Sequence, residues 1–171
     1  VSGQFPKTTI LYSGQAIVND LACLSIYGNT FPSVGTSTPY TITVKNNGTA
    51  IQSNYTVKLM KEGGVLLGSV SGATINSLET LDFTINWTPT ETGATYIYGE
   101  VEMTGDEIAA NNQSPHLNVN VYPVGTAAIT VGTGNSTGRM PMDFHYKNSL
   151  FETIYLASEL NIGGLLIDIQ F

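Results

Sequence analysis

The stretch that decides the fold is Tyr40-Thr-Ile-Thr-Val-Lys-Asn-Asn-Gly48. Its first six residues alternate between apolar and polar side chains, which is the pattern of a β-strand with one buried face. The asparagines and the glycine that follow favour a turn, because both residue types tolerate a positive φ angle. The sequence therefore predicts a strand over residues 39–46 that ends in a turn.

Similar alternation recurs on both sides of this stretch. It predicts six further strands, at residues 20–27, 54–61, 65–70, 78–87, 94–104 and 116–122. Within the first of these the apolar positions change parity, and this change predicts a β-bulge. Turn-forming segments separate the strands, and no long segment has helical periodicity, so we expect an all-β fold. Seven antiparallel strands over residues 20–122 predict a sandwich of the immunoglobulin or fibronectin III type.

Additional strand-like runs flank the predicted sandwich. Residues 1–19 contain a strand-like run at Thr8–Tyr12. Residues 123–171 end in a strand whose apolar face is formed by Leu165, Ile167, Ile169 and Phe171. An apolar strand at a terminus needs a partner for its face and its edge. We therefore predict that this strand mediates self-assembly, by pairing with the other flank, with a neighbouring subunit or with the remainder of a domain.

Composition excludes several classes of partner. The chain has 171 residues, of which 11% are charged, and its formal net charge is −7. An acidic surface repels phosphate groups, so we expect neither a nucleic-acid partner nor docking on anionic lipid. No apolar stretch is long enough to span a bilayer, which argues against membrane insertion. The single cysteine, Cys23, is predicted to be a small buried residue of the first strand.

Several segments resemble one known family. They are Asn19-Asp-Leu-Ala22, residues 40–48, Tyr55-Thr-Val-Lys-Leu59 and the loop at residues 105–112, which contains Gly105-Asp-Glu and Asn111-Asn112. Over residues 20–122 these segments are similar to the CARDB class of bacterial and archaeal cell-adhesion-related domains. The resemblance implies an immunoglobulin- or fibronectin-like module of a large extracellular protein, located at a cell surface or in a filament.

The flanks extend this resemblance. Residues 123–171 look like the opening strands of a jelly-roll-like adhesin domain, with a strand-donating extension as the alternative. Residues 1–19 look like the terminal strands of a preceding β-domain. The resemblance therefore implies that the partners are other copies or neighbouring domains of the same surface protein.

One polar loop is a candidate metal site. Its oxygen-bearing side chains are Asp106, Glu107, Asn111 and Asn112. Hard cations such as calcium favour clusters of such ligands, although the spacing matches no EF-hand loop. The alternative is a solvated loop in which these side chains cap the backbone. We expect no cofactor other than this possible calcium ion.

One face of the predicted strand at residues 94–104 is a candidate ligand surface. It carries Tyr96, Tyr98, Glu100 and Glu102 at alternate positions. A stripe of tyrosines and acids can bind a glycan or a partner protein. The alternative is the ordinary solvent-facing side of a sandwich, since tyrosine is a good strand former.

The sequence offers no support for catalysis. It contains no G-x-S-x-G nucleophile motif, and its only histidines are His116 and His145. We therefore expect a non-catalytic extracellular module that acts in structure or adhesion, through protein–protein contacts and strand pairing. The alternatives are an accessory spacer of a secreted hydrolase and a carbohydrate-binding module.

Overall fold

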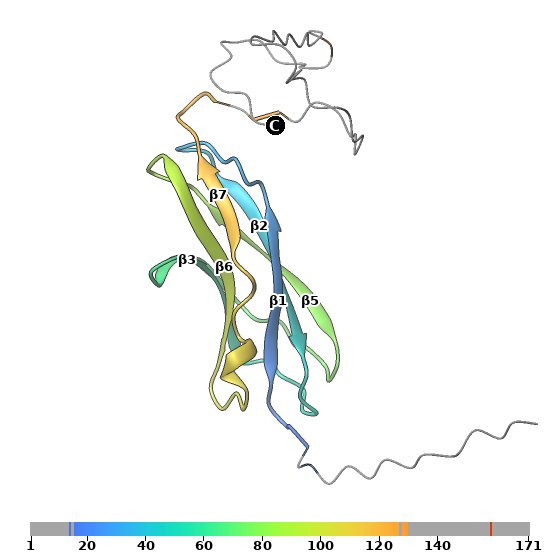
Figure 1. Ribbon diagram of the computed structural model, residues 1–171. Coiled ribbons are helices and arrows are strands. Elements are labelled where there is room, and N and C mark those ends of the chain that lie inside the picture. Colours follow the sequence, from blue (N-terminus) through green and yellow to red (C-terminus); the bar gives the residue numbers. More distant parts are fainter. Residues whose placement is uncertain (1–13, 15, 127, 130–157, 159–171) are drawn as a thin grey trace, which may run out of the picture. The chain divides into compact units, whose positions relative to one another are not determined.

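The computed structural model describes residues 14, 16–126, 128, 129 and 158 (Figure 1). The chain divides into two compact units, Val1–Ala127 and Ala128–Phe171, and the sandwich belongs to the first. The predicted runs Thr8–Tyr12 and 165–171 lie outside the described residues, so strand pairing through them stays a prediction. The proposed division into segments 1–19, 20–122 and 123–171 also stays a prediction.

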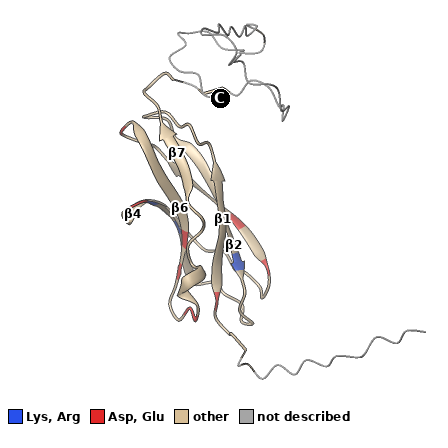
Figure 2. Ribbon diagram, viewed as in Figure 1, with Lys and Arg blue, Asp and Glu red and all other residues tan. Residues whose placement is uncertain are grey.

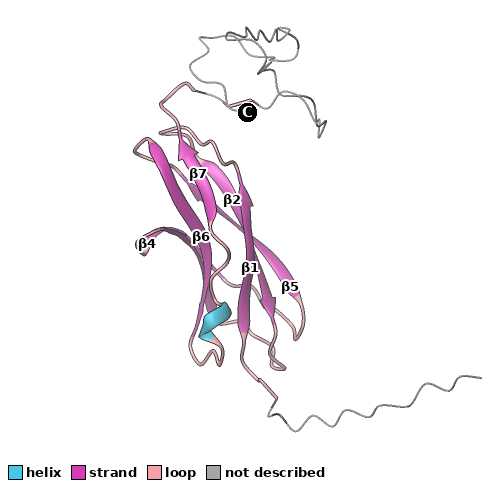
Figure 3. Ribbon diagram, viewed as in Figure 1, coloured by secondary structure: helices cyan, strands magenta, loops and turns pink. Residues whose placement is uncertain are grey.

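The described residues form a sandwich of two antiparallel sheets (Figure 3). In chain order the elements are β1 (Leu21–Gly28), β2 (Thr38–Asn46), β3 (Tyr55–Lys61), β4 (Val65–Ser71), β5 (Thr80–Trp87), β6 (Gly93–Met103), the short 3-10 helix η1 (Ala109–Asn111) and β7 (Leu117–Val121). One sheet has the order β1-β2-β5 and the other β4-β3-β6-β7. All seven predicted strands of the sandwich are confirmed, each within two residues at its ends.

The core lies between the sheets and is built from alternate residues of each strand. Tyr40, Ile42 and Val44 on β2 are fully buried, which confirms the alternation predicted for this stretch. They join the buried faces of the other strands in one apolar cluster. The hydroxyl of Tyr40 donates to the carbonyl of Asn29 at 2.8 Å, so its polar end is satisfied inside the sandwich.

The predicted bulge in β1 is confirmed. Cys23 pairs with Val44, but the next pair is Ser25 with Thr43, so Leu24 has no partner on β2. The extra residue resets the alternation. Cys23 and residues further along β1 therefore reach the core, while Leu24 points outward and is 45% exposed.

The chain enters and leaves the sandwich at opposite ends (Figure 1). Leu21, at the start of β1, pairs with Asn46 at the end of β2. Val121, at the end of β7, pairs with Gly93 at the start of β6. Loops 47–54, 72–79 and 104–116 therefore surround the point where the chain enters, and loops 29–37 and 88–92 lie where it leaves.

Candidate functional site

The segment that leads into β1 is bound along its length to the end of the sandwich. Backbone N–H groups of residues 47–50 donate to the carbonyls of Ile17, Val18 and Asp20, with N–O distances of 2.8–3.2 Å. We call residues 17–20, with loops 47–52 and 105–112, the N-terminal clamp. Because main-chain bonds hold it on one side, the incoming segment is part of the folded sandwich.

Glu107 holds the other side of this segment. One oxygen of its carboxylate, Oε1, accepts from the backbone N–H groups of Val18 at 2.9 Å and Asn19 at 2.8 Å. Its own N–H donates to the carbonyl of Asn19 at 2.9 Å. Asp106 accepts from the N–H of Leu21 at 3.0 Å. Figure 2 shows these acidic residues gathered on the loop between β6 and β7.

The predicted calcium loop is thus part of the N-terminal clamp. Asp106 also accepts from the N–H of Ile108, at 2.9 Å, so both acidic side chains cap backbone groups. Asn111 donates to Asp20 at 2.8 Å. The remaining amide oxygens, Oδ1 of Asn111 and Oδ1 of Asn112, are buried and have no hydrogen-bond partner. A buried oxygen without a partner is destabilising unless water or an ion satisfies it.

Asp20 completes this cluster and was not among the predicted site residues. Its side chain is only 2% exposed although it carries a carboxylate. In the sequence it stood at the start of the predicted strand over residues 20–27 and within the segment Asn19-Asp-Leu-Ala22. Neither position indicates a contact with a loop 91 residues later. Within the described ranges, no group of three or more His, Cys, Asp or Glu side chains is placed to hold a metal ion. A cation here would therefore need the asparagine oxygens.

Asn46 is a buried residue that hydrogen-bonds to two loops at the end of the sandwich that carries the N-terminal clamp. Its side chain is fully buried, and its Nδ2 donates to the carbonyls of Ala50 at 2.8 Å and Ile75 at 3.2 Å. Its Oδ1 accepts from the N–H of Gly48 at 2.9 Å. The sequence predicted only that Asn46 takes part in a turn. In the fold it joins the loop after β2 to the loop before β5.

Gly48 has a different role from the one predicted. Its φ angle is not among the positive ones of the described glycines. A Cβ atom at this position would overlap the carbonyl oxygen of Val18 and lie 2.9 Å from the N of Asp20. Glycine is needed because the incoming segment passes directly over its backbone.

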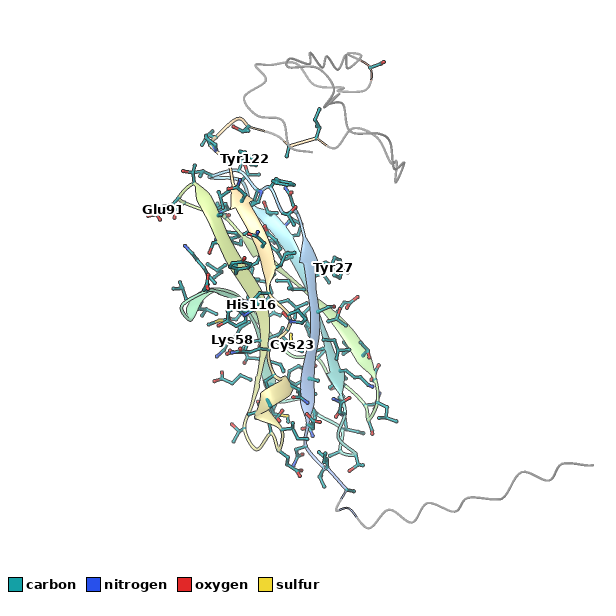
Figure 4. All side chains as sticks on the ribbon, in the orientation of Figure 1. Cys23, Tyr27, Lys58, Glu91, His116 and Tyr122 are labelled. Carbon is teal, nitrogen blue, oxygen red and sulfur yellow. The ribbon has the colours of Figure 1, made fainter. Side chains whose placement is uncertain are left out.

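A second clamp holds the segment that leaves β7. The N–H of Tyr122 donates to the carbonyl of Pro32 at 2.8 Å, and the N–H of Val34 donates back to Tyr122 at 2.9 Å. The Phe31 and Tyr122 rings lie 5.9 Å apart. We call residues 31–34 and 122–126 the C-terminal clamp; Tyr122 is labelled near this end in Figure 4.

The predicted ligand face is only partly open to solvent. Tyr96 is 44% exposed, but Tyr98 is buried because the His116 ring stacks on it with centroids 4.8 Å apart. The expectation that Tyr98 lies on the exposed face is therefore wrong. The sequence could not show this contact, because His116 comes from the loop before β7.

The two acids of the same face are paired with Lys58 of β3, which is labelled in Figure 4. The Lys58 ammonium lies 2.8 Å from the Glu102 carboxylate and 3.8 Å from that of Glu100. Its hydrogen bond to Glu102 raises the pKa of Lys58. Gln113 donates to Glu100 at 2.8 Å. These partners leave the carboxylates less free for a ligand than the sequence suggested.

Cys23 provides a test of the packing between the sheets. Burial raises the pKa of its thiol from the ordinary 9.0 to about 11. Because the thiolate is the reactive species, we expect an aromatic disulfide reagent at pH 8 to react roughly 100-fold more slowly with the native protein than with the chain unfolded in guanidinium. The measurement is the labelling rate followed by absorbance. Equal rates in the two states would mean that the sheets do not cover Cys23.

The CARDB profile matches residues 18–114, which is more than half of the chain. The chain belongs to the CARDB family. The CARDB domain of a Pyrococcus furiosus protein, crystallised in complex with di-metal ions, is 25% identical, with a TM-score of 0.52 over 64% of this chain and 94% of that one. A domain of a protein described as a cell-surface protein of Methanosarcina acetivorans is 17% identical, with a TM-score of 0.50 over 64% and 96%.

The sequence matches none of the curated proteins. In the part of the chain that the structure describes, no helix has the length and apolar character needed to cross a membrane. The predicted resemblance to CARDB domains is confirmed, and so is the sandwich of the immunoglobulin type.

Proposed function

We propose that this CARDB sandwich is a non-catalytic extracellular module that holds neighbouring parts of a surface protein at a fixed separation and carries load between them. The observation that supports it most is that the chain enters at one end of the sandwich, leaves at the other, and is bound at both. A module bound at both ends fixes the relative orientation of its neighbours as well as the distance between them. A free linker at either junction would fix neither.

The two clamps also connect the first strand to the last. Asp106 and Glu107, which hold the segment before β1, lie on the loop that leads to β7. Pro32 and Val34, which hold Tyr122 after β7, lie on the loop that follows β1. A pull on either terminus is therefore shared between both sheets. This arrangement supports a load-bearing role more strongly than a ligand-binding one.

A distance measurement tests this proposed function. Spin labels at Ala16→Cys and Val124→Cys, in a Cys23→Ala background, are expected to give one narrow distance distribution by pulsed electron resonance. Glu107→Ala removes the acceptor of two backbone N–H groups and is expected to broaden it. Glu91→Ala, on the loop between β5 and β6, is the matched control and is expected to leave it unchanged. A broad distribution in the unmodified background would contradict a spacer.

The partners proposed for this module are neighbouring domains or other copies of the same surface protein. The proposal includes strand pairing through residues 165–171 and an adhesive role for the assembled protein. A spacer inside a secreted hydrolase would use the same two clamps and differ only in what it joins. Glycan binding receives less support, since of the two tyrosines predicted for it only Tyr96 has an open ring.

We also propose that the N-terminal clamp binds a calcium ion, the second candidate function. The buried Oδ1 atoms of Asn111 and Asn112 lack partners, and Asp20 and Asp106 bring carboxylates to the same clamp. The related Pyrococcus furiosus domain forms a complex with di-metal ions. Bound calcium would join loop 105–112 to the segment before β1 and stiffen that junction.

Thermal unfolding in calcium and in a chelator tests this second proposal. Calcium at 100 times its dissociation constant is expected to stabilise the fold by about 2.7 kcal/mol. Asn112→Asp replaces an amide with a negatively charged carboxylate. The variant is therefore expected to be less stable in the chelator and to gain more stability from calcium. If calcium changes the unfolding temperature of neither protein, the clamp is held by hydrogen bonds alone.

A further inference from the structure

Exposed apolar side chains gather at the end of the sandwich that carries the N-terminal clamp. Val18 is 43% exposed, Ile51 63% and Leu78 70%. The loops that carry Ile51 and Leu78 are joined, because Gln52 and Ile75 exchange backbone hydrogen bonds of 2.9 and 3.0 Å. Val18 lies against the first of these loops through the bond from Ala50 to its carbonyl, at 3.0 Å. We call these three side chains the apolar end.

Leu78 is held at the apolar end in an unfavourable backbone conformation. Its φ angle is +65°, and it is the one described residue other than glycine with a positive φ. The N–H of Glu79 donates to Asn76 at 3.1 Å and closes a turn in which Leu78 takes the third position. Glycine or asparagine fits that position better than a branched residue does. Leucine therefore gives no advantage to the turn itself, which points to a contact made by its side chain.

We propose that the apolar end is the docking site of the run Thr8–Tyr12 of this same chain. This run contains Ile10, Leu11 and Tyr12, the large apolar side chains nearest before the clamp. Four residues separate Tyr12 from Ile17, and an extended link of this length spans roughly 15 Å. The run is thus tethered beside the apolar end, at an effective concentration in the millimolar range.

Docking would extend the proposed spacer function, since it would fix the chain before the clamp as well as within it. The two remain separable. The spacer depends on hydrogen bonds to residues 17–20, whereas docking depends on three apolar side chains. Loss of docking is therefore expected to leave the distance between labels at residues 16 and 124 unchanged.

Hydrogen exchange of the full 171-residue chain tests the docking. In the wild type, amides of residues 8–12 are expected to exchange at least 10-fold more slowly than the free-chain rate. The double variant Ile51→Asn, Leu78→Asn is expected to return them to that rate, while amides of β2 and β6 keep their protection. Asparagine is chosen because it tolerates the φ angle of Leu78, so the turn is retained.

The matched control is Leu24→Asn, which removes an exposed leucine from β1, away from the apolar end, and is expected to leave residues 8–12 protected. Free-chain exchange of these residues in the wild type would overturn the proposal. So would an equal loss of protection in the control. Protection that rises with protein concentration would also overturn it, because the occupant would then be a second copy.

Discussion

Replacing Asn46 by alanine is expected to lower the free energy of unfolding by about 3 kcal/mol. The side chain is fully buried, and its amide makes three hydrogen bonds to backbone groups of Gly48, Ala50 and Ile75. Alanine leaves these groups without partners, and the bonds to Gly48 and Ile75 lie in the buried interior. The substitution also creates a cavity. Urea denaturation followed by tryptophan fluorescence measures the change.

Asn86→Ala is the matched control for Asn46→Ala. Asn86 lies on β5 with its side chain exposed, so its loss is expected to change stability by less than about 0.5 kcal/mol. Asn46→Asp is expected to be destabilising as well, because a carboxylate cannot donate to Ala50 and Ile75. An alanine variant within 1 kcal/mol of the wild type would mean that Asn46 does not hold these loops together.

Gly48→Ala is expected to have the next largest effect, a loss of about 2–3 kcal/mol. The added methyl group would overlap the carbonyl of Val18. Both atoms in conflict belong to the backbone or lie next to it, so no side-chain rotation relieves the overlap. The segment before β1 must move away, and the hydrogen bonds from Thr49 and Ala50 to it are then lost.

Two measurements separate this effect from general unfolding. Denaturation gives the loss of stability, and hydrogen exchange is expected to show faster exchange at Thr49 and Ala50 while β3 and β6 stay protected. Ser53→Ala, an exposed position of the same loop, is the control and is expected to change neither. Unchanged exchange at Thr49 in Gly48→Ala would contradict the close approach of Val18.

The strands could be predicted from the sequence because each of them is a local pattern. Residues 40–45 alternate between apolar and polar side chains, a pattern that is visible in the sequence itself. The change of parity around Leu24 was enough to predict a bulge. Burial of one face is all that such alternation requires. The pattern says which residues face the core, but it does not say which loop a given polar side chain contacts.

The parts that could not be predicted depend on contacts between distant segments. Asp20 meets Asn111, which lies 91 residues later in the sequence, and His116 covers Tyr98 from the loop before β7. Gly48 has the composition of a turn residue, but it is required for the passage of Val18. In each case the residue type fitted an ordinary local role, so nothing in the sequence indicated the longer-range contact.

In the proposed function, the sandwich carries load between two clamped ends. Single-molecule pulling through handles at residues 16 and 126 tests it most directly. We predict one cooperative rupture with a gain in contour length of roughly 350 Å, and a lower rupture force in Glu107→Ala than in the control Glu91→Ala. Early low-force steps in the wild type, in which the terminal segments peel away before the sheets separate, would contradict the claim.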